Sequence, residues 1–185
     1  PTIYDLYAGD AIGFVFFSDP CDVVFGSSAT NASTRANCAA AMGSALADQF
    51  RQLNPTMMPT TSASAQTPYG FTLSGNPTLA PEISRTQTLG MVWSPASLPG
   101  LNLSLDWWKI RVSDALTPDL PTQILQDCYV HAISSRCAAL ARDPATGVVT
   151  SLNYGTISAG LRKVEGIDLD MGYALTTAAA GRFTL

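Results

Sequence analysis

The sequence predicts an all-β fold, namely part of a transmembrane antiparallel β-barrel with long extracellular loops that carry short helices. Three observations lead to this prediction. Apolar and polar residues alternate along three segments, the apolar faces end in aromatic residues, and short turns alternate with long connections. Aromatic girdles at both membrane interfaces, with tight turns on one side and long loops on the other, are typical of outer-membrane barrels.

Composition favours a barrel wall over a compact enzyme or a nucleic-acid binder. Charged residues make up 13% of the 185 residues, about half the usual share, whereas hydrophobic residues make up 46%. The net charge is −4 and lysine and arginine do not cluster, which argues against nucleic acid as a partner. Because the chain opens on Pro1 rather than on methionine, we expect a fragment of a longer protein, so the missing signal peptide does not indicate location.

The first long connection, about residues 10–83, is expected to be an outer loop. Its Asp-Pro-Cys-Asp sequence at residues 19–22 predicts a tight turn. The alanine-rich residues 31–53 predict a helix with Ser33 or Thr34 near its N-cap. Residues 54–68 are rich in Pro, Ser and Thr and should hold no regular structure. Loops of this length are unusual in compact soluble domains.

Three segments beyond this loop predict strands. A hairpin is expected over about residues 84–113, a second outer loop over about 114–160, a strand over about 161–175, and the start of a further strand at 182–185. The apolar face of the hairpin should carry the following residues: Leu89, Met91 and Trp93 on its first strand, and Leu101, Leu103, Leu105 and Trp107 on its second. The first and third segments should run toward the periplasm and the second away from it.

Past Trp107, the same face continues as Lys109 and Arg111, which would lie above the aromatic girdle near anionic lipid headgroups. An antiparallel soluble sheet with one buried face would also explain the alternation. It would not explain why the apolar faces end in aromatic residues.

Four cysteines form two local pairs, Cys21 with Cys38 and Cys128 with Cys137. An even number of cysteines in polar loops predicts two disulfides and an oxidising compartment, although four free thiols would fit the same spacing. Zinc fits less well, because the spacings are wrong and the lone His131 is a poor fourth ligand.

No catalytic, cofactor-binding or metal-binding residues are expected, and the protein is not expected to be an enzyme. Asp168 and Asp170 lie about 7 Å apart on one face of a strand, and we interpret them as polar residues facing the lumen of a barrel. Residues of the disulfide-braced outer loops are the candidates for substrate contact: Arg35, Tyr129, His131 and Arg136.

Several segments, in order, resemble TonB-dependent outer-membrane receptors. GNPTLAPEISRTQTLGMVWSP, at residues 75–95, is similar to the family segment N-P-x-L-x-P-E-x-S that leads from an outer loop into a strand. DWWKIRVSDA, at residues 106–115, is similar to the following strand, PTQILQDCYV to the helix after it, and GLRKVEGIDLDMGYAL to the descending strand. PTIYDLYAG resembles the family's P-x-I-x-E-L-Y at the top of an earlier strand, with Asp5 where Glu is commoner.

The resemblance implies a barrel of roughly twenty-two strands filled by an N-terminal plug, and this chain would be a fragment from the C-terminal part of the barrel, without the plug. It also implies a location in the outer membrane of a Gram-negative bacterium and contact with outer-membrane lipid. The substrate would be a scarce nutrient, such as an iron chelate, a vitamin or an oligosaccharide. Uptake would be driven by an inner-membrane energy-coupling complex that acts through the missing N-terminal region. A soluble or surface-attached β-rich binding module without a transport role remains the alternative.

Overall fold

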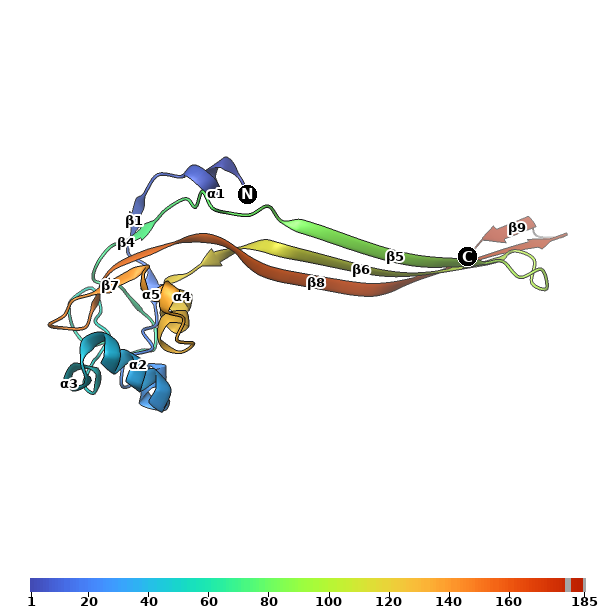
Figure 1. The fold of residues 1–185 in the computed structure, drawn as a ribbon. Coiled ribbons are helices and arrows are strands. Elements are labelled where there is room, and N and C mark those ends of the chain that lie inside the picture. The colour runs from blue at the N-terminus through green and yellow to red at the C-terminus, as the bar shows by residue number, and fades with distance from the viewer. Residues whose placement is uncertain (179–180, 185) are drawn as a thin grey trace. The chain divides into compact units, whose positions relative to one another are not determined.

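The computed structural model describes residues 1–178 and 181–184, and the chain divides into two compact units (Figure 1). The core unit comprises Pro1–Leu79 and Thr117–Ile157, and the strand unit comprises Ala80–Leu116 and Ser158–Leu185. Two long strands, β6 (Leu101–Asp119) and β8 (Val149–Thr177), contribute residues to both units.

The core unit consists of short elements. They are α1 (Ile3–Tyr7), β1 (Ala11–Gly13), β2 (Phe16–Phe17), the 3-10 helix η1 (Ser27–Ala29), α2 (Ala32–Met42), α3 (Ser44–Ala47), β3 (Ala65–Gln66), β4 (Phe71–Leu73), α4 (Pro121–Tyr129), α5 (Ser134–Cys137) and β7 (Leu140–Arg142). Strand β4 pairs with β1 in antiparallel and with β8 in parallel orientation, β7 pairs with β8, and β2 pairs with β3. The long connection predicted over residues 10–83 is therefore largely ordered.

The helix predicted over residues 31–53 is wrong in length. Helix α2 begins after Asn31, whose side chain accepts a hydrogen bond from the backbone N–H of Thr34, so the N-cap is Asn31 and not Ser33 or Thr34. The helix ends at Gly43, where φ is +85°, a left-handed conformation that glycine adopts without strain. After α3, the backbone N–H of Gln52 donates to the Asp22 carboxylate at 2.7 Å, which draws the chain out of helical geometry.

The segment of residues 54–68, for which no regular structure was expected, contributes one short strand. Ala65–Gln66 pairs with Phe16–Phe17 in antiparallel register, and Ala65 is buried. Local hydrogen bonds hold the start of the segment. The Asn54 carboxamide oxygen accepts hydrogen bonds from the backbone N–H groups of Thr56 and Met58.

The segment PTIYDLYAG, likened above to the top of a strand, forms helix α1 instead. The Thr2 hydroxyl accepts from the Asp5 backbone N–H, while the Asp5 carboxylate accepts from the Thr2 backbone N–H at 2.8 Å, which together make a capping box. These hydrogen bonds, those from the Thr2 backbone first, lower the pKa of the Asp5 carboxyl. An acidic residue at this position is therefore explained by helix capping.

Asn76 of the N-P-x-L segment connects three parts of the core unit. Its backbone N–H donates to the Asp5 carbonyl at 2.7 Å, and its side-chain amide donates to the Thr156 carbonyl of β8 at 3.1 Å. Its carboxamide oxygen accepts from the Thr78 backbone N–H at 3.0 Å. The motif thus fixes the chain against α1 and β8 just before it enters the strand unit.

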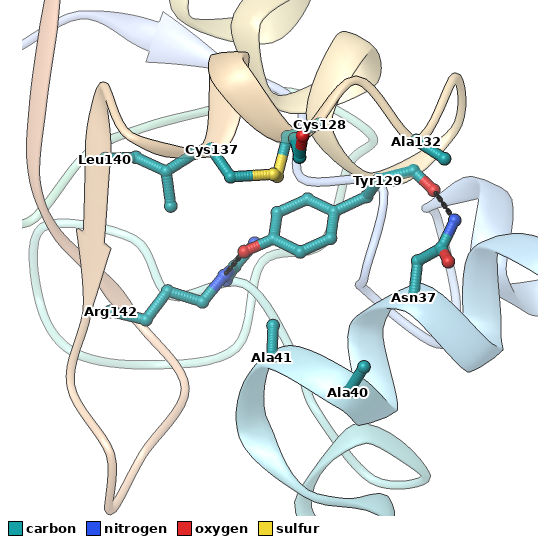
Figure 2. Close-up of a pocket in the computed structure, with 10 residues that line it drawn as sticks. Asn37, Ala40, Ala41, Cys128, Tyr129, Ala132, Cys137, Leu140 and Arg142 are labelled. Carbon is teal, nitrogen blue, oxygen red and sulfur yellow. Dashed lines mark hydrogen bonds between the residues drawn. A yellow bond between two sulfur atoms is a disulfide. The ribbon is translucent and has the colours of Figure 1, made fainter.

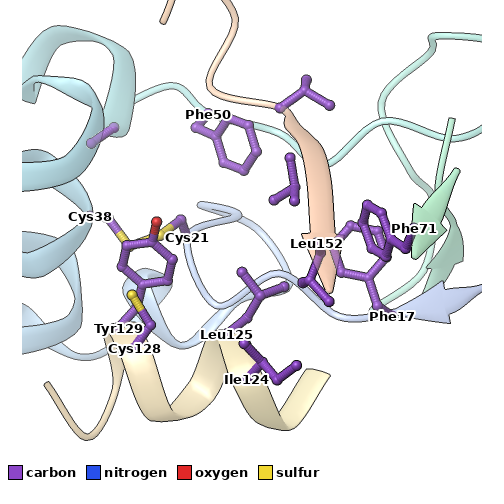
Figure 3. Close-up of a cluster of buried hydrophobic side chains, with 13 residues drawn as sticks. Phe17, Cys21, Cys38, Phe50, Phe71, Ile124, Leu125, Cys128, Tyr129 and Leu152 are labelled. Carbon is purple, nitrogen blue, oxygen red and sulfur yellow. A yellow bond between two sulfur atoms is a disulfide. The ribbon is translucent and has the colours of Figure 1, made fainter. Parts of the chain in front are cut away.

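A hydrophobic core lies within the core unit (Figure 3). Such a core was not predicted for these long connections. The buried residues of this core are Phe17, Cys21, Cys38, Ala47, Phe50, Phe71, Ile124, Leu125, Cys128, Tyr129, Val148, Val149 and Leu152. The two predicted disulfides, Cys21–Cys38 and Cys128–Cys137, are both formed, and no described cysteine is free. The core unit is therefore held by burial and by covalent bonds together.

In the strand unit, β5 (Ile83–Trp93), β6 and β8 lie side by side in that order, and β9 (Gly181–Thr184) pairs with β8 (Figure 1). Strands β5 and β6 pair in antiparallel register over the whole of β5, as expected for a hairpin. β6 and β8 also run antiparallel, because Trp108 contacts Asp168 while Gly100 contacts Ala174.

Two strands extend further than the sequence predicted. β6 continues past Val112 to Asp119, and β8 begins at Val149 rather than near residue 161. The pairing of β6 with β5 stops at Ser113, opposite Ile83, the first residue of β5. Beyond this pair, the carboxylate of the preceding residue, Glu82, accepts a hydrogen bond from the backbone N–H of Leu116 at 2.9 Å and so replaces a strand partner. Of the strand expected at residues 182–185, Leu185 lies outside the described residues, as do Ala179 and Ala180 of the preceding turn.

The register of the hairpin places the predicted apolar residues on a single face. Its cross-strand pairs are Leu89 with Trp107, Met91 with Leu105, and Trp93 with Leu103. On β8 the Asp168 carboxylate accepts from the Trp108 indole N–H at 3.0 Å, so Asp168 shares the opposite, polar face with Trp108. Alternation then puts the following β8 residues on the apolar face: Ile167, Leu169, Met171, Tyr173 and Leu175.

The polar face depends on a glycine. A Cβ atom at Gly166 would lie 2.7 Å from the Trp108 ring, so only glycine leaves room for the indole that donates to Asp168. The apolar face, termed the apolar band below, is open: Leu89, Met91 and Leu169 are 72%, 62% and 69% exposed.

Candidate functional site

The core unit contains a cavity of about 460 Å³ between α2 on one side and α4, α5 and β7 on the other (Figure 2). Small or apolar groups form most of its wall, and polar groups are few. Its lining residues are Asn37, Ala40, Ala41, Cys128, Tyr129, Ala132, Ser134, Cys137, Leu140 and Arg142. A largely apolar wall with a few polar groups is typical of small-molecule sites.

Tyr129 and Arg142 form the polar floor of this cavity. The Tyr129 side chain is buried, and its hydroxyl accepts a hydrogen bond from the Arg142 Nε at 2.9 Å (Figure 2). The guanidinium carbon of Arg142 lies 4.8 Å from the centre of the Tyr129 ring, within the range of a cation–π contact. The ring is therefore held in one orientation.

Asp19 balances the charge of Arg142. Its carboxylate accepts from both terminal nitrogens of the guanidinium, at 2.8 and 2.9 Å, in a bidentate pair whose side chains are only 6% and 1% exposed. Burial by itself lowers the pKa of the Arg142 guanidinium. The charges and hydrogen bonds of Asp19 and Tyr129 outweigh this effect, so the pKa is raised overall. Arg142 is thus a fixed cation that is already neutralised.

The opposite wall comes from α2. The Asn37 side-chain amide donates to the Tyr129 carbonyl at 2.9 Å and ties α2 to the end of α4 (Figure 2). Ala40 and Ala41 follow on the same helix and keep the space open because their side chains are small. With its arginine already paired, the cavity suits an uncharged or weakly polar group better than an anion.

The structure separates the four residues predicted to contact substrate. Tyr129 lines the cavity, whereas His131 is exposed and does not line it. Arg35 donates from Nε and Nη2 to the Ser28 carbonyl, at 3.3 and 3.2 Å.

Arg136 is occupied by two carboxylates. It pairs with Asp119 through a hydrogen bond and with Asp127 at 3.2 Å. The hydrogen bond with Asp119, chiefly, raises the pKa of the Arg136 guanidinium. These contacts join the end of β6 and the later part of α4 to α5, which indicates a structural role for Arg136.

Asn37, Ser134 and Arg142 are lining residues that the sequence did not single out. Arg142 stands just before the Asp143 turn, and nothing in the local sequence marks it as the partner of Asp19, 123 residues away. The local signal available was the disulfide, because Cys128 and Cys137 both line the cavity.

Among residues 1–178 and 181–184, no three His, Cys, Asp or Glu side chains are grouped so that they could hold a metal ion. No helix within this part of the chain is long and apolar enough to cross a membrane. Asp168, one of the paired carboxylates considered above, is bonded to the Trp108 indole.

Comparison with known proteins identifies the family. The family model described as TonB dependent receptor-like, beta-barrel matches residues 2–185. No curated protein matches the sequence. Among solved structures, the chain is similar to a mutant of the ferric enterobactin receptor PfeA from Pseudomonas aeruginosa in complex with enterobactin, with 18% identity and a TM-score of 0.38 over 64% of this chain and 14% of that one. It is also similar to the siderophore receptor PirA from Acinetobacter baumannii, with 18% identity and a TM-score of 0.32 over 56% of this chain and 13% of that one. The chain thus spans a small part of the length of these receptors.

Proposed function

Since the chain belongs to the TonB-dependent receptor β-barrel family, we propose that it forms part of the wall of a transmembrane β-barrel in the outer membrane of a Gram-negative bacterium. The complete receptor takes up a scarce nutrient, an iron chelate, a vitamin or an oligosaccharide, and is driven by an inner-membrane energy-coupling complex. In this proposal the chain has no enzymatic activity.

The apolar band is the observation that carries this proposal. Across β5, β6 and β8 it presents leucine, methionine and tryptophan side chains that nothing among the described residues covers, such as Leu89 at 72% exposed. The polar face opposite carries Asp106, Trp108 and Asp168. A strand of 11 residues, the length of β5, suffices to cross a bilayer at the usual tilt.

A water-soluble or surface-attached module would have to bury the apolar band against another element. Large exposed apolar patches on soluble proteins are rare unless they bind a partner or a membrane. The band therefore favours the transmembrane wall over this alternative.

We assign the core unit to the extracellular loops, including their short helices. Two disulfides fit an oxidising location outside the cytoplasm. With this side outermost, β5 and the part of β8 after Gly166 run toward the periplasm, and β6 runs away from it.

We place substrate contact at the cavity. Of the four residues predicted to contact substrate, this proposal keeps Tyr129. Contact with the apolar wall that Tyr129 helps to form, and hydrogen bonds to Asn37 and Ser134, would hold a neutral part of the nutrient. Arg35, His131 and Arg136 do not line the cavity, and their contact with substrate would require another part of a large ligand.

The test is uptake by the full-length receptor in cells that lack their own copy of its gene. Radiolabelled ferric chelates, cobalamin and maltooligosaccharides are offered in turn, with and without a protonophore that collapses the energy supply. Uptake of one class that stops with the protonophore supports the proposal. Binding without any energy-dependent uptake would contradict it.

Substitution of Ala40 tests the cavity. A tryptophan at Ala40 should fill the space and weaken substrate binding at least tenfold, because an indole occupies much of it. Ala36→Trp, one helical turn earlier on α2 and outside the lining, is the matched control and should bind as the unaltered receptor does.

A further inference from the structure

A group of basic side chains extends the apolar band along the hairpin. The register sets Gln87 opposite Lys109 and Arg85 directly opposite Arg111, two and four residues beyond the Leu89–Trp107 pair. Because side chains alternate along a strand, Arg85, Lys109 and Arg111 lie on the same face as the apolar band.

Strand β8 adds a fourth cation to this face. Glu165 contacts Lys109 at 3.9 Å and Lys163 at 3.1 Å, so Lys163 and Glu165 share the face of Lys109. The four residues Arg85, Lys109, Arg111 and Lys163, termed the basic cluster, thus have one carboxylate between them. Within residues 1–178 and 181–184, no ion pair involves Arg85 or Arg111.

The Arg85–Arg111 pair is unfavourable by itself. Like charges directly opposite each other on neighbouring strands repel, and both arginines are exposed. Two hollows border the pair, one of about 200 Å³ lined by Arg85, Gln87, Lys109 and Arg111, and one of about 290 Å³ lined by Ile83, Arg85, Arg111 and Ser113. An anion seated between the guanidinium groups would remove the repulsion.

The chemistry of the pair and its surroundings identifies the anion. Guanidinium groups bind phosphate through paired charge-assisted hydrogen bonds. The apolar band begins at the next residue of this face, with Trp107 and Leu89. A ligand that joins a phosphate to hydrocarbon contacts both the arginine pair and the apolar band, whereas a free phosphate would contact the arginine pair alone.

We propose that the basic cluster binds the phosphate of a phosphorylated membrane lipid whose acyl chains lie along the apolar band. This inference rests on the proposed function, because it needs the band to face lipid. Arg85 and Arg111 bind the phosphate oxygens in the hollows between them, and Lys109 and Lys163 add positive charge at its side. The site would hold one lipid at the rim of the barrel, outside the cavity assigned to substrate.

The experiment uses the full-length receptor in nanodiscs that contain equal amounts of dioleoyl phosphatidic acid and dioleoyl phosphatidylcholine. After mild detergent extraction, native mass spectrometry counts the lipids that remain bound. The unaltered receptor should retain phosphatidic acid about tenfold over phosphatidylcholine, and Arg85→Gln/Arg111→Gln, which keeps only the two lysines, should lose most of this preference. Arg162→Gln, which removes a charge from the opposite face of β8, should keep the preference.

Heat-modifiable migration and substrate uptake, measured on the same variants, separate the two proposals. If the unaltered receptor inserts and transports but retains both lipids equally, the lipid site alone is overturned. If the unaltered receptor fails to insert, the transmembrane wall is overturned and the lipid site with it. Should the glutamine variant fail to fold, Arg85→Lys/Arg111→Lys keeps the charge, and a preference reduced severalfold then supports the guanidinium contact. Release of the lipid by millimolar inorganic phosphate alone would overturn the assignment to a lipid.

Discussion

At the scale of single residues, the buried pair of Asp19 and Arg142 is the strongest electrostatic feature of the core unit. It joins the turn after β2 to β7 and sets the position of Tyr129 at the cavity floor. Removal of one partner from a buried pair leaves the other charge without water or a counter-ion. The stability of the core unit and the shape of its cavity therefore depend on the same contact.

We expect Arg142→Met to destabilise the core unit by about 3–5 kcal/mol, since Asp19 would remain buried and unpaired. Denaturant unfolding followed by the fluorescence of a probe on α2 measures the change. Arg35→Met, at an exposed arginine bonded only to a backbone carbonyl, is the control and should cost no more than about 1 kcal/mol. Equal losses for the two variants would contradict a dominant role for the buried pair.

Asp143 gives the core unit a pH-dependent turn. Hydrogen bonds from Thr146, its backbone N–H first and then its hydroxyl, and from the Ala145 backbone lower the pKa of the Asp143 carboxyl. A lowered folded-state pKa means that the contribution is present above the unfolded-state pKa and is lost as pH falls through the folded-state pKa.

The melting temperature of the unaltered protein should therefore exceed that of Asp143→Ala at about pH 7. The difference should shrink as pH falls to about 3, where more of the carboxyl is protonated. Scanning calorimetry at both pH values measures it. A difference that stays constant or grows on acidification would show that the carboxylate charge does not stabilise the turn.

At the scale of elements, each disulfide joins segments that the core also holds. Cys21–Cys38 ties the turn after β2 to α2, and Cys128–Cys137 ties α4 to α5 beside the cavity. Cys21 and Cys38 are fully buried, so this bridge belongs to the core as well as to the covalent frame.

Replacing Cys21 and Cys38 together by alanine should lower the free energy of unfolding by about 3 kcal/mol, the loop-closure value for a separation of 17 residues. Replacing Cys128 and Cys137 should cost about 2.5 kcal/mol in the same model, because the separation is only nine residues. Substrate binding should respond in the opposite order, since only the second bridge lines the cavity. Denaturant titrations measure the loss of stability in both variants, and equilibrium binding measures the loss of substrate affinity. A reversed order of the two variants in either measurement would contradict the prediction.

The apolar band makes a prediction about the hairpin. Leu105 lies midway along it, opposite Met91, and Leu105→Arg should cost about 2–4 kcal/mol if this position faces the bilayer centre. Ser104→Arg, one residue away on the polar face, should be tolerated much better. Heat-modifiable migration of the full-length receptor in detergent measures assembly, and comparable defects in both variants would argue against a lipid-facing band.

At the scale of the whole molecule, the strand unit could be predicted from the sequence and the core unit largely could not. Alternation is a local signal, so the face shared by Leu89, Met91 and Leu105 was readable before any pairing was known. The core unit depends on contacts between distant segments, such as Gln52 with Asp22 and Arg142 with Asp19, which leave no periodic trace. The cavity follows from that long-range packing, and for this reason only Tyr129 among its polar residues was foreseen.

The two units also differ in what holds them together. All the residues of the hydrophobic core and both disulfides belong to the core unit. The strand unit relies on the ladder between β5, β6 and β8 and, in the proposed function, on lipid or detergent against the apolar band. Reduction of the disulfides should therefore weaken one unit and leave the other unchanged.

Hydrogen exchange on the full-length receptor in detergent tests this difference. After treatment with a thiol reductant, backbone amides of α2, α4 and β7 should exchange faster, since the core unit loses about 5.5 kcal/mol of cross-link stabilisation in the additive loop-closure model. Amides in the paired part of β5 and β6 should keep their protection, because no cysteine lies in either strand. Simultaneous loss of protection in both units would mean that they unfold as one, so that the core unit also stabilises the strand unit.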